Sequence, residues 1–240
     1  MTAQELYKAG KLNDAIQALS NELRQNPTDT KRRTFLFELL CFAGEFDRAE
    51  KQLESLSREG MQADLGALLY RSALHAERMR QGMFVKGEFP KPLQEAAATS
   101  AVSGTLNGKP FTSIEDSDSR IGANLELFVA GSYVWMPFSV LAKVEMLPPK
   151  RLRDLLWAPV HVRPSAQYKG TELGEVFSPV LAPGSAGHAD DAVRLGRMTV
   201  WDGPGGDAAP LGQKVWLVDG EEFPLLELRR LEIPAAAATA

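Results

Sequence analysis

The stretch GKLNDA at residues 10–15 and its counterpart GEFDRA at residues 44–49 decide the fold of the front of this chain. They lie 34 residues apart, and Leu19 and Leu53 extend the match at the same spacing. In each copy a glycine, which tolerates a left-handed backbone, precedes a stretch with helical apolar spacing. The alanine that ends each copy is small enough to let two helices approach closely. The spacing predicts two copies of one helical hairpin, with Gly10 and Gly44 at the turns.

A 34-residue period is the repeat length of tetratricopeptide hairpins, which stack into curved scaffolds and usually bind other proteins. Thr2 and Glu5 fit a capping box at the first helix, and Asn26-Pro27 ends the second helix. Asn13 and Asp47 occupy equivalent repeat positions, and we expect them to be the N-cap residues of the helices that follow.

One more amphipathic helix is expected over residues 61–81, after Gly60 ends the fourth helix. Its apolar side would carry Leu65, Leu68, Leu69 and Leu74. The period is lost there, because Arg78 stands where a third glycine would be. Two repeats and a final helix predict a short, capped stack.

The second half of the chain has the pattern of β-structure. Asn107-Gly108 predicts a tight turn, residues 125–136 predict a hairpin that turns at Gly131-Ser132, and residues 140–146 predict a strand. Further apolar runs at 173–181, 195–201, 214–218 and 223–231 are bounded by Gly, Pro or Asp. This spacing favours a small antiparallel sheet or a partly closed barrel.

The expected fold class is therefore multidomain α and β. We expect tetratricopeptide-like helices over residues 1–88, a linker over 89–101, a β-rich α+β antiparallel domain over 102–233 and a flexible tail over 234–240.

The composition argues against several classes of protein. The formal charge is −4, and no basic stripe of the kind that binds nucleic acid is present. The single cysteine, Cys41, cannot form an internal disulfide. No secretory signal and no membrane-spanning apolar run is seen, so a cytoplasmic protein without a membrane association is expected.

The sequence offers only incomplete matches to catalytic, metal-binding or phosphate-binding motifs. His75, His161 and His188 have no metal-ligand spacing, and GPGG at 203–206 lacks the context of a phosphate loop. The run DSDSR at 116–120 lacks the remaining ligands of a calcium loop, so we expect its aspartates to cap backbone N–H groups and to pair with Arg120. We expect no catalytic residue, no metal and no cofactor.

The helical part offers a better candidate for function, because the first helix of each hairpin lines the concave side of such a stack. The repeat register places a set of mixed side chains there, which would suit a docked helix or peptide. They are Lys31, Thr34, Glu38, Cys41 and Phe42 in the second unit, with Gln4, Tyr7 and Lys8 in the first.

Six strings in the second half occur in an order that resembles a known family. They are DSDSR (116–120), YVWMPF (133–138), LRDLLWAP (152–159), PGS (183–185), RLGRMTVW (194–201) and LLELR (225–229). Together they resemble the ImpE family, also called SciE or TagJ, an accessory protein of bacterial type VI secretion loci. The family-like residues that we expect to be structural are Asp116, Asp118, Arg120, Asp154, Trp157, Arg194, Arg197 and Trp201.

The resemblance implies a helical repeat domain, a β-rich domain and no catalytic activity. It also implies protein partners: the small subunit of the contractile sheath and, through it, the unfoldase that recycles contracted sheath. Family members look longer after the second repeat, with a further helical hairpin where this chain has only residues 90–100. The oligomeric state is left open.

A second hypothesis is a small-molecule-binding or catalytic β domain, with the helices serving only in oligomerisation. It requires Asp116, Asp118, Arg120, Arg197 and Trp201 to converge in one deep pocket.

Overall fold

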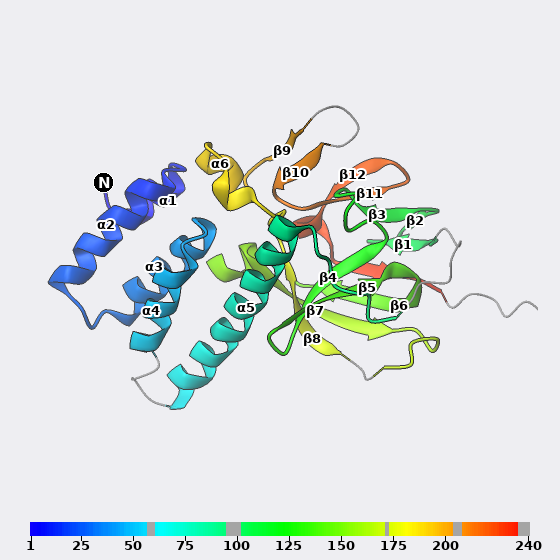
Figure 1. Cartoon of the computed structure of the whole chain (residues 1–240), viewed down its shortest axis with the longest axis horizontal. Coiled ribbons are helices and arrows are strands. Elements are labelled where there is room, and N and C mark those ends of the chain that lie inside the picture. Colours follow the sequence, from blue (N-terminus) through cyan, green and yellow to red (C-terminus); the bar gives the residue numbers. More distant parts are fainter. Residues whose placement is uncertain (57–60, 95–101, 171–172, 204–207, 235–240) are drawn as a thin grey trace, which may run out of the picture.

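In the computed structural model of the chain, the 34-residue repeat forms paired helices. The structure describes residues 1–56, 61–94, 102–170, 173–203 and 208–234. Five helices come first and a strand-rich part follows beside them (Figure 1). The helices are α1 (Ala3–Lys8), α2 (Leu12–Gln25), α3 (Thr30–Phe42), α4 (Phe46–Leu56) and α5 (Met61–Lys86).

The two predicted hairpins are confirmed. Helix α1 packs on α2, and α3 packs on α4. Gly10 and Gly44 have φ angles of 77° and 71°, so each turn uses the left-handed backbone that glycine adopts without strain. The capping box is also present, since the Glu5 N–H donates to Thr2 Oγ1 and the Thr2 N–H donates to Glu5 Oε2.

The two predicted N-caps are wrong. Asn13 and Asp47 are the second residues of α2 and α4, and the N-cap of α2 is Lys11, whose side chain makes no capping bond. Instead the Leu12 N–H donates to Asp191 Oδ2 at 2.7 Å, and this carboxylate comes from the second half of the chain. The free N–H is therefore satisfied by tertiary structure.

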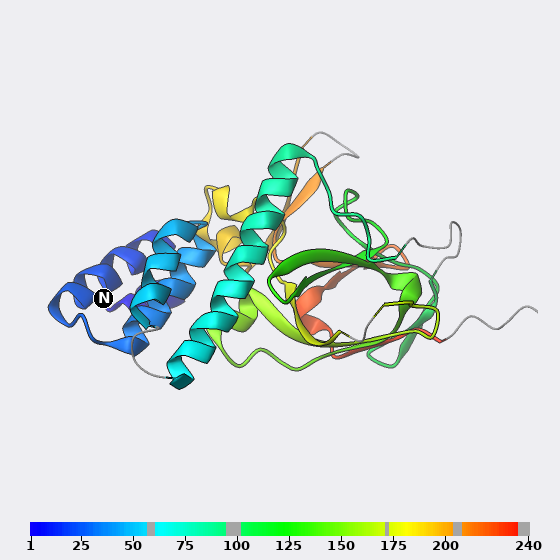
Figure 2. The same ribbon diagram turned by 60° about the horizontal axis from the view of Figure 1, so that its bottom comes forward.

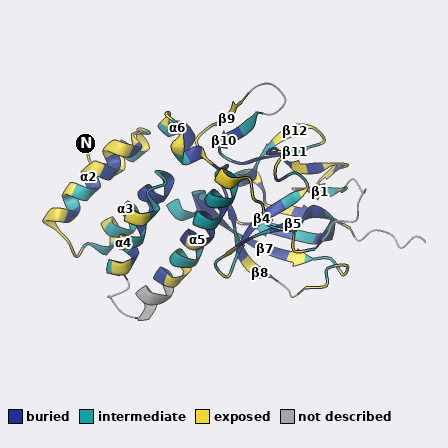
Figure 3. Ribbon diagram, viewed as in Figure 1, coloured by how far each residue is buried: buried dark blue, intermediate teal, exposed yellow. Residues whose placement is uncertain are grey.

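Helix α5 continues beyond the predicted end at residue 81, and its predicted apolar side is only partly right. Leu74 is buried, whereas Leu68 and Leu69 are 59% and 43% exposed. The C-terminal part of α5 lies against the strands and the N-terminal part extends past them (Figures 1 and 3). Gly60 and the side chain of Leu65 lie outside the described residues.

The strand-rich part is built on one curved antiparallel sheet (Figure 2). Its eight strands lie in the order β2-β1-β13-β6-β7-β8-β4-β5. The bounds are β1 (Gly104–Leu106), β2 (Lys109–Phe111), β4 (Asn124–Val129), β5 (Ser132–Pro137), β6 (Leu141–Met146), β7 (Trp157–Pro164), β8 (Gly174–Pro179) and β13 (Arg230–Glu232).

Two smaller sheets and several short helices complete this part. The smaller sheets contain β3 (Ile114–Asp116), β11 (Val215–Val218) and β12 (Glu221–Pro224), and β9 (Thr199–Asp202) with β10 (Ala209–Gly212). The short helices are η1 (Phe138–Val140), η2 (Leu152–Leu155), η3 (Ser185–Gly187), α6 (Asp191–Arg194) and η5 (Leu225–Glu227).

The tight turns of the β region are confirmed. Asn107 and Gly108 join β1 to β2 with φ angles of 50° and 82°, as a type I′ turn requires. β4 and β5 form the expected hairpin. The turn itself uses Ala130 and Gly131, with φ angles of 48° and 85°, so it lies one residue earlier than Gly131-Ser132.

Strand β7, with eight residues between β6 and β8, was not predicted from the sequence. Pro159 makes this segment look unlike a central strand, because proline cannot donate to a ladder. The register explains why it is tolerated. The pairing of β7 with β6 ends at Val160, so Pro159 faces only Phe177 of β8.

One apolar core runs across the junction of the two parts. The helices share a cluster of buried side chains with Phe128, Tyr133, Trp135, Leu156 and Trp157. A second core lies inside the curved sheet. The domain limits stay a prediction, and residues 95–101 and 235–240 of the expected linker and tail lie outside the described residues. None of the described helices has the length and apolarity needed to cross a bilayer.

Candidate functional site

The concave side of the helical stack is divided into an open groove and a covered part. The open groove lies between α1 and α3, and its lining residues are Thr2, Ala3, Gln4, Leu19, Glu22, Lys31, Arg32 and Phe35. Gln4 and Lys31 are exposed at this groove, as the repeat register predicted. Its floor is apolar, since Leu19 and Ala3 belong to the core of the stack.

Three more of the predicted residues lie along α1 and α3. Lys8 is exposed, and the half-buried ring of Tyr7 meets the Phe35 ring edge-on at a centroid distance of 5.8 Å. Thr34 is half-buried, and its Oγ1 donates to the Thr30 carbonyl at 3.0 Å. Their role in binding stays a prediction.

The expectation of an open surface is wrong for Glu38, Cys41 and Phe42. Their residues are 7%, 4% and 0% exposed. The chain's own second half packs onto this part of α3, and Trp157 lies 6.4 Å from the neighbouring Phe37 ring. These three side chains are therefore unavailable to a partner.

Glu38 is buried, and among the described residues no cation lies within salt-bridge distance of it. Tyr70 Oη donates to its Oε1 at 3.3 Å, and the charges of Arg153 and Asp154 act on it from η2. Burial is the largest influence and raises the pKa of Glu38 from 4.5 to about 7. Burial likewise raises the pKa of the Cys41 thiol well above its ordinary value.

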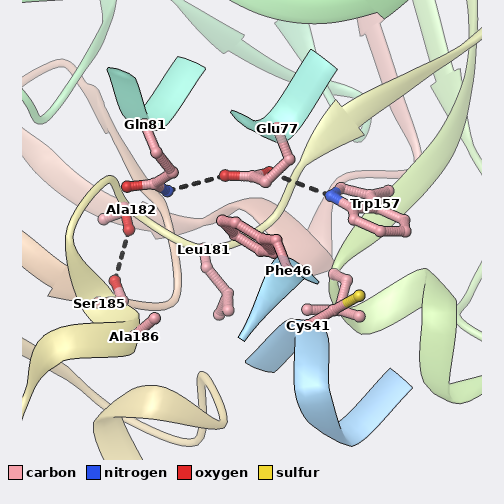
Figure 4. Close-up of a pocket in the computed structure, with 10 residues that line it drawn as sticks. Cys41, Phe46, Glu77, Gln81, Trp157, Leu181, Ala182, Ser185 and Ala186 are labelled. Carbon is pink, nitrogen blue, oxygen red and sulfur yellow. Dashed lines mark hydrogen bonds between the residues drawn. The ribbon is translucent and has the colours of Figure 1, made fainter. Parts of the chain in front are cut away.

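A small cavity lies behind this junction (Figure 4). Glu77 of α5 accepts from Trp157 Nε1 at 3.0 Å and from Gln81 Nε2 at 2.8 Å. Cys41 and Phe46 line the same cavity from the second repeat. The family-like Trp157 is thus a contact between the two parts of the chain.

The segment 183–197, which contains η3 and α6, contacts the first hairpin, formed by α1 and α2. Arg197 donates to the carbonyls of Lys8 at 3.0 Å and Tyr7 at 2.5 Å, and its guanidinium lies 5.1 Å from the Tyr7 ring. Arg194 donates to Asn13 Oδ1 at 3.2 Å and to Asp191 Oδ1 at 2.8 Å. A cation on the last carbonyls of a helix also suits the helix dipole.

The same segment lies against both repeat glycines. A Cβ added at Gly10 would meet Arg197 Nη1 at 3.3 Å, and one added at Gly44 would meet Ala186 Cβ at 2.9 Å. The two equivalent turns of the repeat therefore dock side by side on one loop of the second half.

A buried ion network, absent from the sequence prediction, joins α5 to the strands. Arg80 is fully buried and holds Glu126 through two bonds, from Nε at 2.7 Å and from Nη2 at 3.0 Å. Lys214 Nζ also donates to Glu126 and lies 2.5 Å from Asp116 Oδ2. Tyr133 Oη donates to Glu126 Oε1 at 2.5 Å. Every charge is paired, as burial requires.

The charges of this network perturb each other strongly. Burial opposes ionisation of Glu126, but Arg80 and Lys214 outweigh it and lower its pKa from 4.5 to about 2. Burial, aided by the charge of Glu126, raises the pKa of Asp116 from 3.8 to about 6. The two carboxylates share one lysine, so the carboxylate without the arginine holds its proton more readily.

One sequence signal pointed to this network. Glu126 lies within Asn124–Val129, a strand whose central residues are all buried, and Lys214 directly precedes the apolar strand β11. A charge inside a continuous apolar strand requires a buried partner. The sequence does not say that the partner is Arg80 of α5.

The remaining motif residues have structural partners. The Asp118 N–H donates to Asp116, and Arg120 pairs with Asp118 at 2.6 Å, as predicted. Asp154 accepts from the N–H groups of Lys150 and Arg151 at 2.9 and 3.0 Å.

Trp201 is 43% exposed on β9. Arg197 binds the carbonyls at the end of α1, whereas Asp116 and Asp118 are buried in ion pairs beside the strands. Among the described residues, these side chains and Trp201 therefore do not converge in one pocket, as the second hypothesis requires. Within the described part of the chain, no group of three His, Cys, Asp or Glu residues could hold a metal ion.

The model of the family described as "ImpE protein" matches residues 108–232, and a tetratricopeptide repeat model matches residues 6–71. This chain belongs to the ImpE family.

The type VI secretion system accessory component TagJ of Pseudomonas aeruginosa (strain PAO1) is 32% identical over 262 residues, covering 97% of this chain and 91% of that protein. A crystal structure of a Vibrio parahaemolyticus protein superposes with a TM-score of 0.83 at 23% identity and covers 99% of each chain. That likeness concerns the fold alone.

Proposed function

We propose that this ImpE-family protein is a non-catalytic adaptor of a bacterial type VI secretion system that acts in the cytoplasm. Its helical repeats bind the small subunit of the contractile sheath, and through that subunit the protein assists sheath assembly or recycling by the unfoldase. The support is the relationship to TagJ, an accessory component of such a system, together with the tetratricopeptide repeat.

The open groove between α1 and α3 is the observation that supports the proposed location of the binding site. It combines an apolar floor at Leu19 and Phe35 with polar side chains at Gln4 and Lys31. An amphipathic segment could bury apolar residues on that floor while its polar side faces the rim. The covered part of the concave side, at Glu38 and Phe42, takes no part.

A binding measurement between the purified protein and the small sheath subunit tests this proposal. Gln4→Trp with Lys31→Glu should fill the groove and reverse its charge, and we expect at least about tenfold weaker binding. The control for the charge change is Lys51→Glu, because Lys51 is exposed on α4 outside the groove. Equal binding by wild type and the groove variant would refute the assignment of the groove.

A further inference from the structure

A second surface, on the strand-rich part, has the chemistry of a binding site. It is a cleft of about 700 Å³ between the end of β6, the start of η2 and the residues that lead into β13. We call it the basic cleft and define it by Leu147, Lys150, Arg151, Arg229 and Arg230. It involves none of the residues of the α1–α3 groove.

The cleft is basic although the protein is acidic. Five cationic side chains line it, namely those of Lys150, Arg151, Arg153, Arg229 and Arg230. Three carboxylates line it as well, those of Glu145, Asp154 and Glu175. The local excess of positive charge contrasts with the net charge of −4 of the whole chain.

Two of the three carboxylates are already engaged. Glu145 pairs with Arg230 at 3.1 Å and with Lys143 at 2.9 Å. Asp154 accepts from two backbone N–H groups and lies 3.6 Å from Arg153 Nε. These contacts leave little negative charge to neutralise the other cations of the cleft.

Three cations remain without a carboxylate among the described residues. Lys150 and Arg151 are exposed and form no ion pair there. Arg229 Nη1 donates to the carbonyls of Leu226 at 2.9 Å and Leu228 at 2.5 Å. These bonds fix the guanidinium but leave its charge uncompensated. A preformed, unneutralised cation loses little conformational entropy when it meets an anion.

The rim of the cleft is apolar. Leu147 is 75% exposed and Pro148 is exposed beside it, between the last residue of β6 and the cations Lys150 and Arg151 that precede η2. An exposed leucine adds nothing to the binding of a small anion, but it supplies a contact for an apolar side chain. The carboxylates interspersed among the cations would repel a continuous phosphate backbone.

We propose that the basic cleft binds an acidic segment of a partner protein, with its carboxylates on Lys150, Arg151 and Arg229 and an apolar residue on Leu147. This inference is independent of the groove that we propose for the sheath subunit. It gives the protein two binding surfaces of different chemistry, one on each part of the chain, as an adaptor requires.

Fluorescence anisotropy with the full chain and a labelled nine-residue peptide of alternating Glu and Leu tests the cleft. We expect saturable binding that weakens as salt is raised, because exposed charges are screened. Lys150→Glu with Arg151→Glu should weaken binding about tenfold or more, and the corresponding double alanine variant should lie between it and the wild type. Circular dichroism establishes that each variant is folded.

The matched control is Lys109→Glu with Arg163→Glu, which makes the same change in net charge at two exposed residues outside the cleft. It should leave binding within about twofold of wild type. Equal loss in both double variants would mean attraction to the whole surface and would overturn the proposal. So would the absence of binding, or tighter binding of a labelled oligothymidylate than of the peptide.

Discussion

Glu38→Gln should stabilise this protein at alkaline pH. Glu38 is buried at the junction between α3 and the second half, with the Tyr70 hydroxyl as its hydrogen-bond donor. A glutamine carbonyl can accept the same bond. The substitution keeps the volume of the side chain and removes only the charge that the site disfavours.

The magnitude follows from the pKa of Glu38, which burial raises from 4.5 to about 7. The unfolded chain ionises at the lower value, so folding becomes less favourable as pH rises from about 4.5 through about 7. Each unit of pKa difference corresponds to about 1.4 kcal/mol. At pH 8 the buried carboxylate therefore costs about 3 kcal/mol, and at pH 5 it costs under about 1 kcal/mol.

Urea unfolding at pH 5 and pH 8 measures this difference. The variant should be more stable than wild type by about 3 kcal/mol at pH 8 and by less than about 1 kcal/mol at pH 5. Glu115→Gln is the control, since Glu115 is exposed on β3, and it should change stability by less than about 0.5 kcal/mol at both values. A Glu38→Gln protein that is no more stable than wild type at pH 8 would show that the buried carboxylate does not destabilise the fold.

Two further predictions concern the contacts between the two parts of the chain. Arg80→Met leaves Glu126 without its bidentate partner and should destabilise the protein by about 3 to 5 kcal/mol in urea unfolding. A loss below about 1 kcal/mol would contradict the burial of this pair. Gly44→Ala places a Cβ 2.9 Å from Ala186 Cβ, whereas the Cβ of Gly10→Ala meets Arg197 Nη1 at the longer distance of 3.3 Å. Each substitution puts alanine in a left-handed backbone conformation, which costs about 1 kcal/mol of stability, but Gly44→Ala should lower the free energy of unfolding more than Gly10→Ala. Equal losses of stability would argue against close packing of the Gly44 turn on Ala186.

Most of the helices and tight turns of this fold could be predicted from the sequence. A 34-residue spacing indicated the hairpins, and an Asn-Gly dipeptide indicated the first β-turn. Within each copy of the repeat, and at the Asn-Gly turn, the signal comes from residues a few positions apart, where backbone preference and helical period act directly. The strings around Asp116, Trp157 and Arg197 identified the family for the same reason, because they are contiguous.

The positions of the candidate binding residues were predicted only in part, and their role in binding stays a prediction. Lys31 and Gln4 lie at an open groove, as the repeat register implied. Glu38 and Phe42 follow from the same register but are covered, because the register describes an isolated stack and not one that carries a second domain on its concave side. Nothing within α3 could reveal what packs against it.

The order of the residues was enough to predict two helical hairpins, the antiparallel strands that follow them and the family. The open face of the hairpins became known only from the packing of the two parts. The tertiary structure also shows that Asp191 caps α2, that Pro159 is tolerated in β7, and that Arg80 meets Glu126 across 46 residues of chain. The difference arises from the sequence separation of the residues that interact. Turns and helical periods arise from neighbouring residues, whereas the burial of a charge or a groove depends on partners distant in sequence.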